Sequence, residues 1–192
     1  MRALRTLIAC LCLSAPAWAE DAPAKPPAEK PEAVKQRQLD QLLAKLHTAP
    51  DDKDMASTED QIWQIWSRNT SPTAEVLLRE GSAALTHGDY EPAEQLLTQA
   101  IETYPDYAEV WNRRAALYYA QGRYDAALID VDHALALEPR NFGALTGKGM
   151  ILRAQKKDDL AEAAFKDALA INPHLDSVQA MLKRIAKERP NI

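Results

Sequence analysis

Cysteine, phenylalanine and glycine are scarce in this chain of 192 residues. There are two cysteines, Cys10 and Cys12, and both lie within the N-terminal segment 1–19. Residues 20–192 therefore exclude disulfides, thiol catalysis and thiolate metal sites. Phenylalanine occurs twice and glycine six times, whereas alanine and leucine are abundant and 46% of the residues are hydrophobic. Such a composition favours closely packed helices over a twisted sheet.

Sequence motifs for catalysis or phosphate binding are also missing. The chain has no GxxxxGK[ST] or GxGxxG loop and no HxxxH or HExxH pair. Its histidines suit loop or capping positions: His47, His87, His133 and His174. Gly149 lies within a predicted helix, where close packing explains it. The acidic pairs 51–52 and 158–159 fall at predicted helix starts, where carboxylates cap a helix. We expect no enzymatic activity, no cofactor and no metal.

The N-terminal segment 1–19 has the pattern of a secretory signal peptide. Arg2 and Arg5 supply the positive start, an apolar run follows, and the segment 17–19 (AWA) is a small-x-small cleavage site. The apolar run, at ~9–12 residues, is too short to cross ~30 Å of hydrocarbon as a helix. We predict cleavage after Ala19. Because the pattern is typical of bacteria, we also predict a periplasmic location for the mature chain.

A second interpretation of the leader remains open. The segment 7–10 (LIAC) resembles a lipoprotein box, in which Cys10 would carry a lipid anchor. Cutting there would leave almost no apolar region, so cleavage after Ala19 is favoured.

Removal of residues 1–19 lowers the basic count from 23 to 21 against 28 acidic residues, a formal charge of about −7. An acidic mature chain argues against nucleic acids and anionic membranes as partners.

The segment between the leader and the folded part is rich in proline. Residues 20–33 contain four prolines and no aromatic residue, so they bury too little apolar area to offset ordering entropy. We predict a disordered spacer there, with a binding role for its prolines as the alternative. Helical periodicity begins at Val34 and predicts helices over 34–48 and 51–68. Residues 34–73 are predicted to form an N-terminal helical hairpin.

A fixed 34-residue spacing dominates the rest of the chain. It relates Pro105, Pro139 and Pro173; Ala93, Ala127 and Ala161; Ala100, Ala134 and Ala168; Leu97, Val131 and Phe165; and Leu77, Trp111 and Leu145. Gly88 and Gly122 share one position, which Lys156 fills in the third copy. A period of this length indicates stacked helical units rather than one mixed core.

The segment 108–141 resembles a tetratricopeptide repeat in its order of Trp111, Tyr118, Gly122, alanines and Pro139. Leucine replaces the family's tryptophan in the other two copies, which weakens single positions without disturbing the period. The resemblance implies an all-α, right-handed solenoid of three hairpins. Its predicted units are repeat 1 (74–107), repeat 2 (108–141), repeat 3 (142–175) and a capping helix with a tail (176–192).

In this family the first helices of the repeats line a concave groove. The resemblance therefore implies a set of partner-binding residues: Leu78, Arg79, Ser82, Asn112, Arg113, Tyr119, Met150 and Arg153. The cations and the amide would hold carbonyls or a carboxylate, and the others would give apolar contact. Some chaperone-binding relatives have Lys and Asn where this chain has Leu78 and Ser82, so their two-carboxylate clamp is not supported. A merely solvated groove is the alternative.

Two functions follow from this organisation. The first is a non-catalytic adaptor or scaffold that binds a partner's peptide or helix in the groove. The second is a structural subunit docked permanently in an envelope assembly through its N-terminal hairpin.

Trp63 and Trp66 are predicted to pack that hairpin onto repeat 1, with an exposed interface anchor as the alternative. We also hypothesise an ion pair between Glu80 and Arg114 across adjacent first helices.

Overall fold

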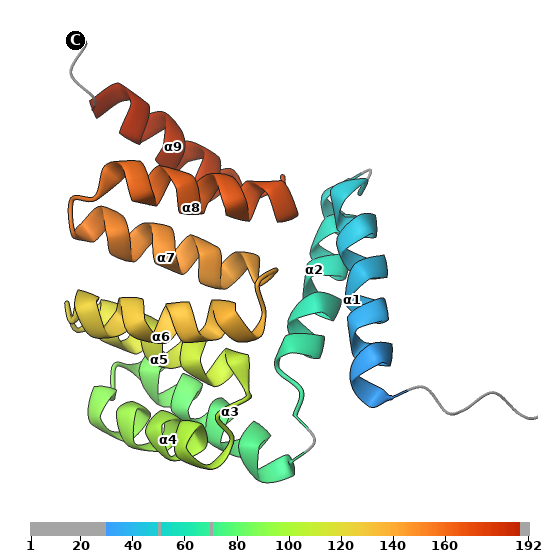
Figure 1. The fold of residues 1–192 in the computed structure, drawn as a ribbon, viewed down its shortest axis with the longest axis vertical. Helices are drawn as coiled ribbons and strands as arrows, with labels where there is room; N and C mark the ends of the chain where they lie inside the picture. Colours follow the sequence, from blue (N-terminus) through green and yellow to red (C-terminus); the bar gives the residue numbers. More distant parts are fainter. Residues whose placement is uncertain (1–29, 50, 70, 189–192) are drawn as a thin grey trace, which may run out of the picture.

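The computed structural model describes residues 30–49, 51–69 and 71–188, and these residues form nine helices and no strand (Figure 1). The helices are α1 (Pro31–His47), α2 (Asp52–Trp66), α3 (Pro72–His87), α4 (Tyr90–Thr103), α5 (Ala108–Ala120), α6 (Tyr124–Leu137), α7 (Phe142–Ala154), α8 (Asp158–Ile171) and α9 (Asp176–Glu188). The predicted all-α fold is confirmed. The predicted signal peptide and most of the predicted spacer lie outside the described residues.

Three hairpins, α3–α4, α5–α6 and α7–α8, form the stack, and each turns in the same way. The turn residue has a positive φ in all three: 83° at Gly88, 72° at Gly122 and 60° at Lys156. At each turn the next backbone N–H donates back to a carbonyl five residues earlier, as in Arg123 to Tyr118 at 2.8 Å. This bond satisfies a carbonyl at the end of the first helix. The third hairpin therefore keeps the geometry although its glycine is lost.

The repeated alanines let the helices of each hairpin pack closely. Both alanine series are fully buried: Ala93, Ala127, Ala161, Ala100, Ala134 and Ala168. Large and small residues also compensate across the first and third hairpins. Phe165 is opposite Gly149, where a Cβ atom would lie 2.4 Å from the Phe165 ring. Leu97 likewise faces Gly81, at 2.9 Å from such a Cβ. The predicted packing role of Gly149 is confirmed.

The helix α9 covers the open side of α8 at the end of the stack (Figure 1). Val178 and Ile185 are buried there, together with Phe165 and Leu152. The face of α9 away from α8 is charged, which suits a helix that ends a stack. This is the arrangement expected of the predicted capping helix.

The helices α1 and α2 form an N-terminal hairpin that lies along one side of the stack (Figure 1). The α1 helix begins at Pro31, three residues before the predicted Val34, because proline is favoured in the first turn of a helix. The predicted spacer therefore ends at residue 30 rather than 33. The Asp51 carboxylate accepts hydrogen bonds from Lys53 N and Asp54 N, so its predicted capping role is confirmed.

The N-terminal hairpin does not pack onto repeat 1 as predicted. Its apolar side contacts the start of α7 and the corner between α8 and α9, where Trp66 lies against Phe142. Polar contacts lie along the same edge of the hairpin. Arg140 binds Asp40 and Gln36 of α1. The Asn172 amide donates to Glu59 at 2.5 Å, and His174 Nε2 lies 3.0 Å from the Leu46 carbonyl. The Tyr107 hydroxyl also donates to the Ser67 carbonyl. The chain therefore folds back along repeats 2 and 3.

Candidate functional site

A cavity of about 300 Å³ lies between the first helices of repeats 2 and 3. Its lining comprises Trp63, Asn112, Arg113, Ala115, Ala116, Tyr119, Val131, Gly143, Gly147, Met150 and Ile151. Ala116 is exposed and Asn112, Tyr119 and Met150 are partly exposed, so solvent reaches the cavity. We call this cavity and its lining residues the groove site.

Four of the eight predicted partner-binding residues meet in the groove site. Asn112, Arg113 and Tyr119 come from α5, and Met150 comes from α7. The family resemblance implied these positions, because it assigns such slots of the first helices to the groove; their role in binding a partner stays a prediction.

The other four predicted residues lie elsewhere. Leu78 is buried in the core of the stack, with 6% of its surface exposed, and does not line the cavity. The exposed Arg79 forms an ion pair with Glu80 at 2.9 Å. Ser82 is partly exposed on α3 but does not line the cavity. Arg153 binds Glu188 of α9 at 2.5 Å and therefore joins the capping helix to α7.

A buried carboxylate supports the groove site from below. The Glu109 side chain is fully buried, and its Oε1 atom lies 2.8 Å from Arg113 Nε. The amides of Asn112 and Asn141 donate to its other oxygen at 3.1 and 3.4 Å. Burial raises the pKa of Glu109, and the nearby Arg113 opposes that rise. The pair holds the Arg113 guanidinium, which is 40% exposed, at the rim of the cavity.

Sequence reasoning missed the contribution of Trp63 to the groove site. Its ring centroid lies 5.1 Å from that of Trp66 and 5.6 Å from that of Phe142, both in edge-to-face geometry. A Cβ atom on Gly143 would lie 2.4 Å from the Trp63 ring, so only glycine permits this approach. Gly143, a glycine in the first turn of a predicted helix, was the signal in the sequence that a bulky group packs there. Its partner lies far earlier in the chain, outside the repeats, and could not be identified from the repeat pattern.

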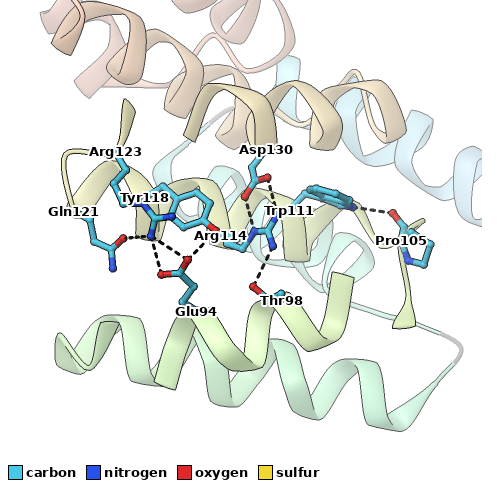
Figure 2. A network of polar contacts seen from close by, with 9 residues as sticks. All are labelled: Glu94, Thr98, Pro105, Trp111, Arg114, Tyr118, Gln121, Arg123 and Asp130. Atoms are coloured by element: carbon cyan, nitrogen blue, oxygen red, sulfur yellow. Dashed lines mark hydrogen bonds and ion pairs between the residues drawn. The ribbon is translucent and has the colours of Figure 1, made fainter. Parts of the chain in front are cut away.

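The hypothesis of an ion pair between Glu80 and Arg114 is wrong. Arg114 instead binds both carboxylate oxygens of Asp130, at 2.7 and 3.0 Å, and donates to Thr98 at 3.1 Å (Figure 2). Asp130 is on α6 and Thr98 on α4, so Arg114 points toward the second helices and does not line the groove site. Glu80 is paired with its sequence neighbour Arg79.

A second polar group in Figure 2 joins repeats 1 and 2 at their turns. The Arg123 guanidinium lies 4.1 Å from the Tyr118 ring centroid and 2.8 Å from a carboxylate oxygen of Glu94. The Tyr118 hydroxyl donates to the same carboxylate at 3.1 Å. The hydrogen bonds from Arg123 and Tyr118 hold the pKa of Glu94 below its usual value, although desolvation, the largest single effect, acts in the opposite direction. These contacts join α5 to α4, and α5 carries five of the eleven residues that line the groove site.

Trp111 was predicted to be a core residue, and it is half-buried against the stack. Its indole stacks on His133, with ring centroids 4.5 Å apart, and its N–H donates to the Pro105 carbonyl at 2.8 Å (Figure 2). His133 therefore packs on an aromatic ring rather than lying in a solvated loop. Neither residue lines the groove site.

Within the described ranges, no group of three or more histidine, cysteine, aspartate or glutamate side chains is placed to hold a metal ion. Across the same part of the chain, no helix combines the length and the apolar character that crossing a bilayer requires.

Comparison with known proteins places these hairpins in a family. The tetratricopeptide repeat model matches residues 78–136 and 130–176. A TPR repeat-containing protein of Rhizobium etli is 35% identical over 154 residues, which cover 80% of this chain and 75% of that protein. The small glutamine-rich tetratricopeptide repeat-containing protein 2 of Saccharomyces cerevisiae is 32% identical over 115 residues. This alignment spans 60% of the present chain but 33% of the yeast protein.

A solved structure shares the fold. The first TPR domain of Spaghetti (RPAP3), bound to the HSP90 peptide SRMEEVD, superposes with a TM-score of 0.59 at 23% identity. The superposition covers 61% of this chain and 93% of that domain. With more than half of its residues matched by the family model, the chain belongs to the tetratricopeptide repeat family.

Proposed function

We propose that this protein is a non-catalytic interaction module that binds a segment of another protein in the groove site. The observation that carries the proposal is the groove site itself. It combines an apolar cavity with Arg113 and Asn112 at its rim, and it lies on the first helices of the repeats. The peptide bound by the RPAP3 domain gives independent support, because that domain has the same fold.

Arg113 and Asn112 would orient the bound segment. A guanidinium and an amide can donate to backbone carbonyls or to a carboxylate of the partner. Arg113 Nε lies 2.8 Å from a carboxylate oxygen of Glu109, and the outer nitrogens of the fork would serve the ligand. A preformed site of this kind avoids the entropic cost of ordering the binding residues.

Exchange of Arg113 tests this function. Arg113→Gln retains a donor for the buried Glu109 but removes the positive charge. Arg79→Gln is the matched control, because it removes an arginine at the equivalent slot of repeat 1, outside the cavity. Tagged protein should capture specific partners, and Arg113→Gln should lose them while Arg79→Gln retains them. Capture that survives Arg113→Gln, with helicity unchanged, would contradict the proposal.

Among the described residues, no observation favours a permanently docked envelope subunit. That alternative requires an apolar face on the N-terminal hairpin for another protein. The described contacts instead use this face within the chain, because Trp66, Ile62 and Leu39 are buried against Phe142 and its neighbours.

We further propose that the mature protein works in a bacterial periplasm after cleavage following Ala19. The support is the leader pattern of residues 1–19, with Arg2 and Arg5 before the apolar run. Cell fractionation and the intact mass of the mature chain test this. A mature chain that begins at Glu20 is expected. A lipidated chain that begins at Cys10, or an uncleaved chain in the cytoplasm, would contradict the proposal.

A further inference from the structure

We propose that Trp63 closes the groove site into a pocket for one bulky apolar side chain, leucine, methionine or phenylalanine, of an extended peptide. The inference rests on the groove binding proposed above. It adds the chemistry of the bound residue and assigns a specificity-determining role to a residue outside the repeats.

Trp63 is held rigidly as one wall of the pocket. Edge-to-face contacts with Trp66 and Phe142 fix the plane of its indole. Gly143 lets the indole approach the backbone of α7. The wall thus comes from α2, which folds back along the stack, and the three repeats alone would leave this end of the groove site open.

The other walls of the pocket are mainly apolar. The space between them is left where a lining position holds glycine, which has no side chain. Val131 and Ile151 are buried and form the floor, and Tyr119 and Met150 flank it. At Gly147 a Cβ atom would have no neighbour within 4 Å. Glycine at position 147 therefore leaves part of the cavity unfilled.

The size of the pocket selects an extended segment with one inserted side chain. The cavity of about 300 Å³ accommodates one large side chain, whereas a helix with its side chains is about 10–12 Å wide. In an extended chain, alternate side chains point to opposite sides. One side chain can then enter while its neighbours remain in solvent.

The charges of the lining residues further limit which side chain can enter the pocket. The lining residues include one cation, Arg113, and no acidic side chain. A lysine or arginine that entered the pocket would approach the guanidinium of Arg113 and lose hydration, with no acidic lining residue to pair with. An apolar side chain has no charge to desolvate on entry, and burial of its surface favours binding.

Blocked tripeptides, acetyl-Ser-X-Ser-amide with X as Leu, Met, Phe, Ala or Lys, test the selectivity on the mature chain. Titrations followed by the amide resonance of Gly147 and the indole resonance of Trp63 give the affinities. The Leu, Met and Phe peptides should bind about ten- to a hundredfold more tightly than the Ala peptide. The Lys peptide should bind no better than the Ala peptide. Equal affinities for all five peptides would overturn the inference.

Two variants at one position locate the binding. Gly147→Leu places a large side chain in the cavity. A Cβ atom at this position has no neighbour within 4 Å, so the change causes no clash there. The variant should lose binding of the Leu peptide. Gly147→Ala is the matched control and should retain it. Unchanged binding to Gly147→Leu would overturn the inference. If captured partners are lost in Arg113→Gln but kept in Gly147→Leu, groove binding stands and the side-chain pocket fails.

Discussion

Lys156 carries the main backbone strain of the described residues. It is the non-glycine residue with a positive φ there, at 60°, whereas Gly88 and Gly122 occupy the equivalent turns. An L-residue in this region is strained by the approach of its Cβ to the carbonyl oxygen. The repeat geometry imposes this conformation, because the Lys157 N–H must still reach the Leu152 carbonyl at 2.9 Å.

Replacement of Lys156 by glycine should therefore stabilise the protein. We expect Lys156→Gly to raise the free energy of unfolding by about 0.5–1 kcal/mol, because relief of the strain exceeds the added entropy of the unfolded chain. Gly122→Ala should lower it by a similar amount, about 1 kcal/mol, as the matched reverse change. Urea unfolding followed by circular dichroism measures both. A destabilised Lys156→Gly would show that the lysine side chain contributes more than its backbone costs.

Glu109 should make the stability depend on pH. Burial raises its folded-state pKa above the unfolded value, so the folded protein binds more protons at intermediate pH. The free energy of unfolding contributed by this group is then greatest below the unfolded pKa and falls as the pH rises through the folded pKa. Glu109→Gln retains the amide contacts but cannot ionise. Melting temperatures from pH 4 to pH 8 should fall less steeply for Glu109→Gln than for the wild type.

Glu188 is the matched control for this pH dependence. It is exposed, and its pKa is lowered by hydrogen bonds from Arg184 and Arg153, so its contribution has the opposite sign. Glu188→Gln should leave the negative slope from Glu109 in place. If Glu109→Gln had the same slope as the wild type, the arginine at 2.8 Å would have cancelled the burial of the carboxylate.

Within α7, two glycines that are two residues apart point to opposite sides of the helix and serve different purposes. Gly149 faces Phe165, whose ring a Cβ atom would approach to 2.4 Å, whereas Gly147 faces empty space. Alanine is preferred over glycine in a helix by about 1 kcal/mol. The same substitution should therefore have opposite effects at the two positions.

We expect Gly147→Ala to stabilise the protein by about 0.5–1 kcal/mol and Gly149→Ala to destabilise it by about 1–3 kcal/mol. Chemical unfolding of the two variants measures the difference. A smaller partner should relieve the overpacking, so Gly149→Ala combined with Phe165→Leu should cost less than the sum of the single changes. Strictly additive costs would mean that the strain at Gly149 lies in the backbone and not against Phe165.

The repeat helices could be predicted from the sequence because their signals are local. Alanines and prolines recur with the 34-residue period, and each acts within its own hairpin. Leu78 was placed in the groove because its slot faces the groove in the family, yet in this chain it is buried, as Leu77 is. The ion pair of Arg114 was missed since its partner, Asp130, lies on the second helix of the same repeat rather than on a neighbouring first helix.

At the scale of the whole molecule, the position of the N-terminal hairpin was not predictable. Residues 31–66 lie outside the 34-residue register, and their place depends on the fit of Trp66 to Phe142, which comes two repeats later in the chain. Trp66 is 5% exposed, whereas the polar contact of Asp40 with Arg140 at the same interface is open to solvent. Docking of the hairpin should thus depend on apolar burial rather than on its ion pairs.

Removal of the Trp66 side chain should release the hairpin without unfolding the repeats. Truncation of a buried tryptophan costs about 3–5 kcal/mol, which is enough to undock two helices that contact the stack mainly through this cluster. Hydrogen exchange measured by mass spectrometry should show α1 and α2 exchanging at least a hundredfold faster in Trp66→Ala, with α3–α8 still protected. Asp40→Ala, on the exposed edge of the same interface, should change exchange less than about fivefold. Faster exchange in all nine described helices together would mean that the hairpin and the stack form one cooperative unit, and the groove site would then exist only in the intact fold.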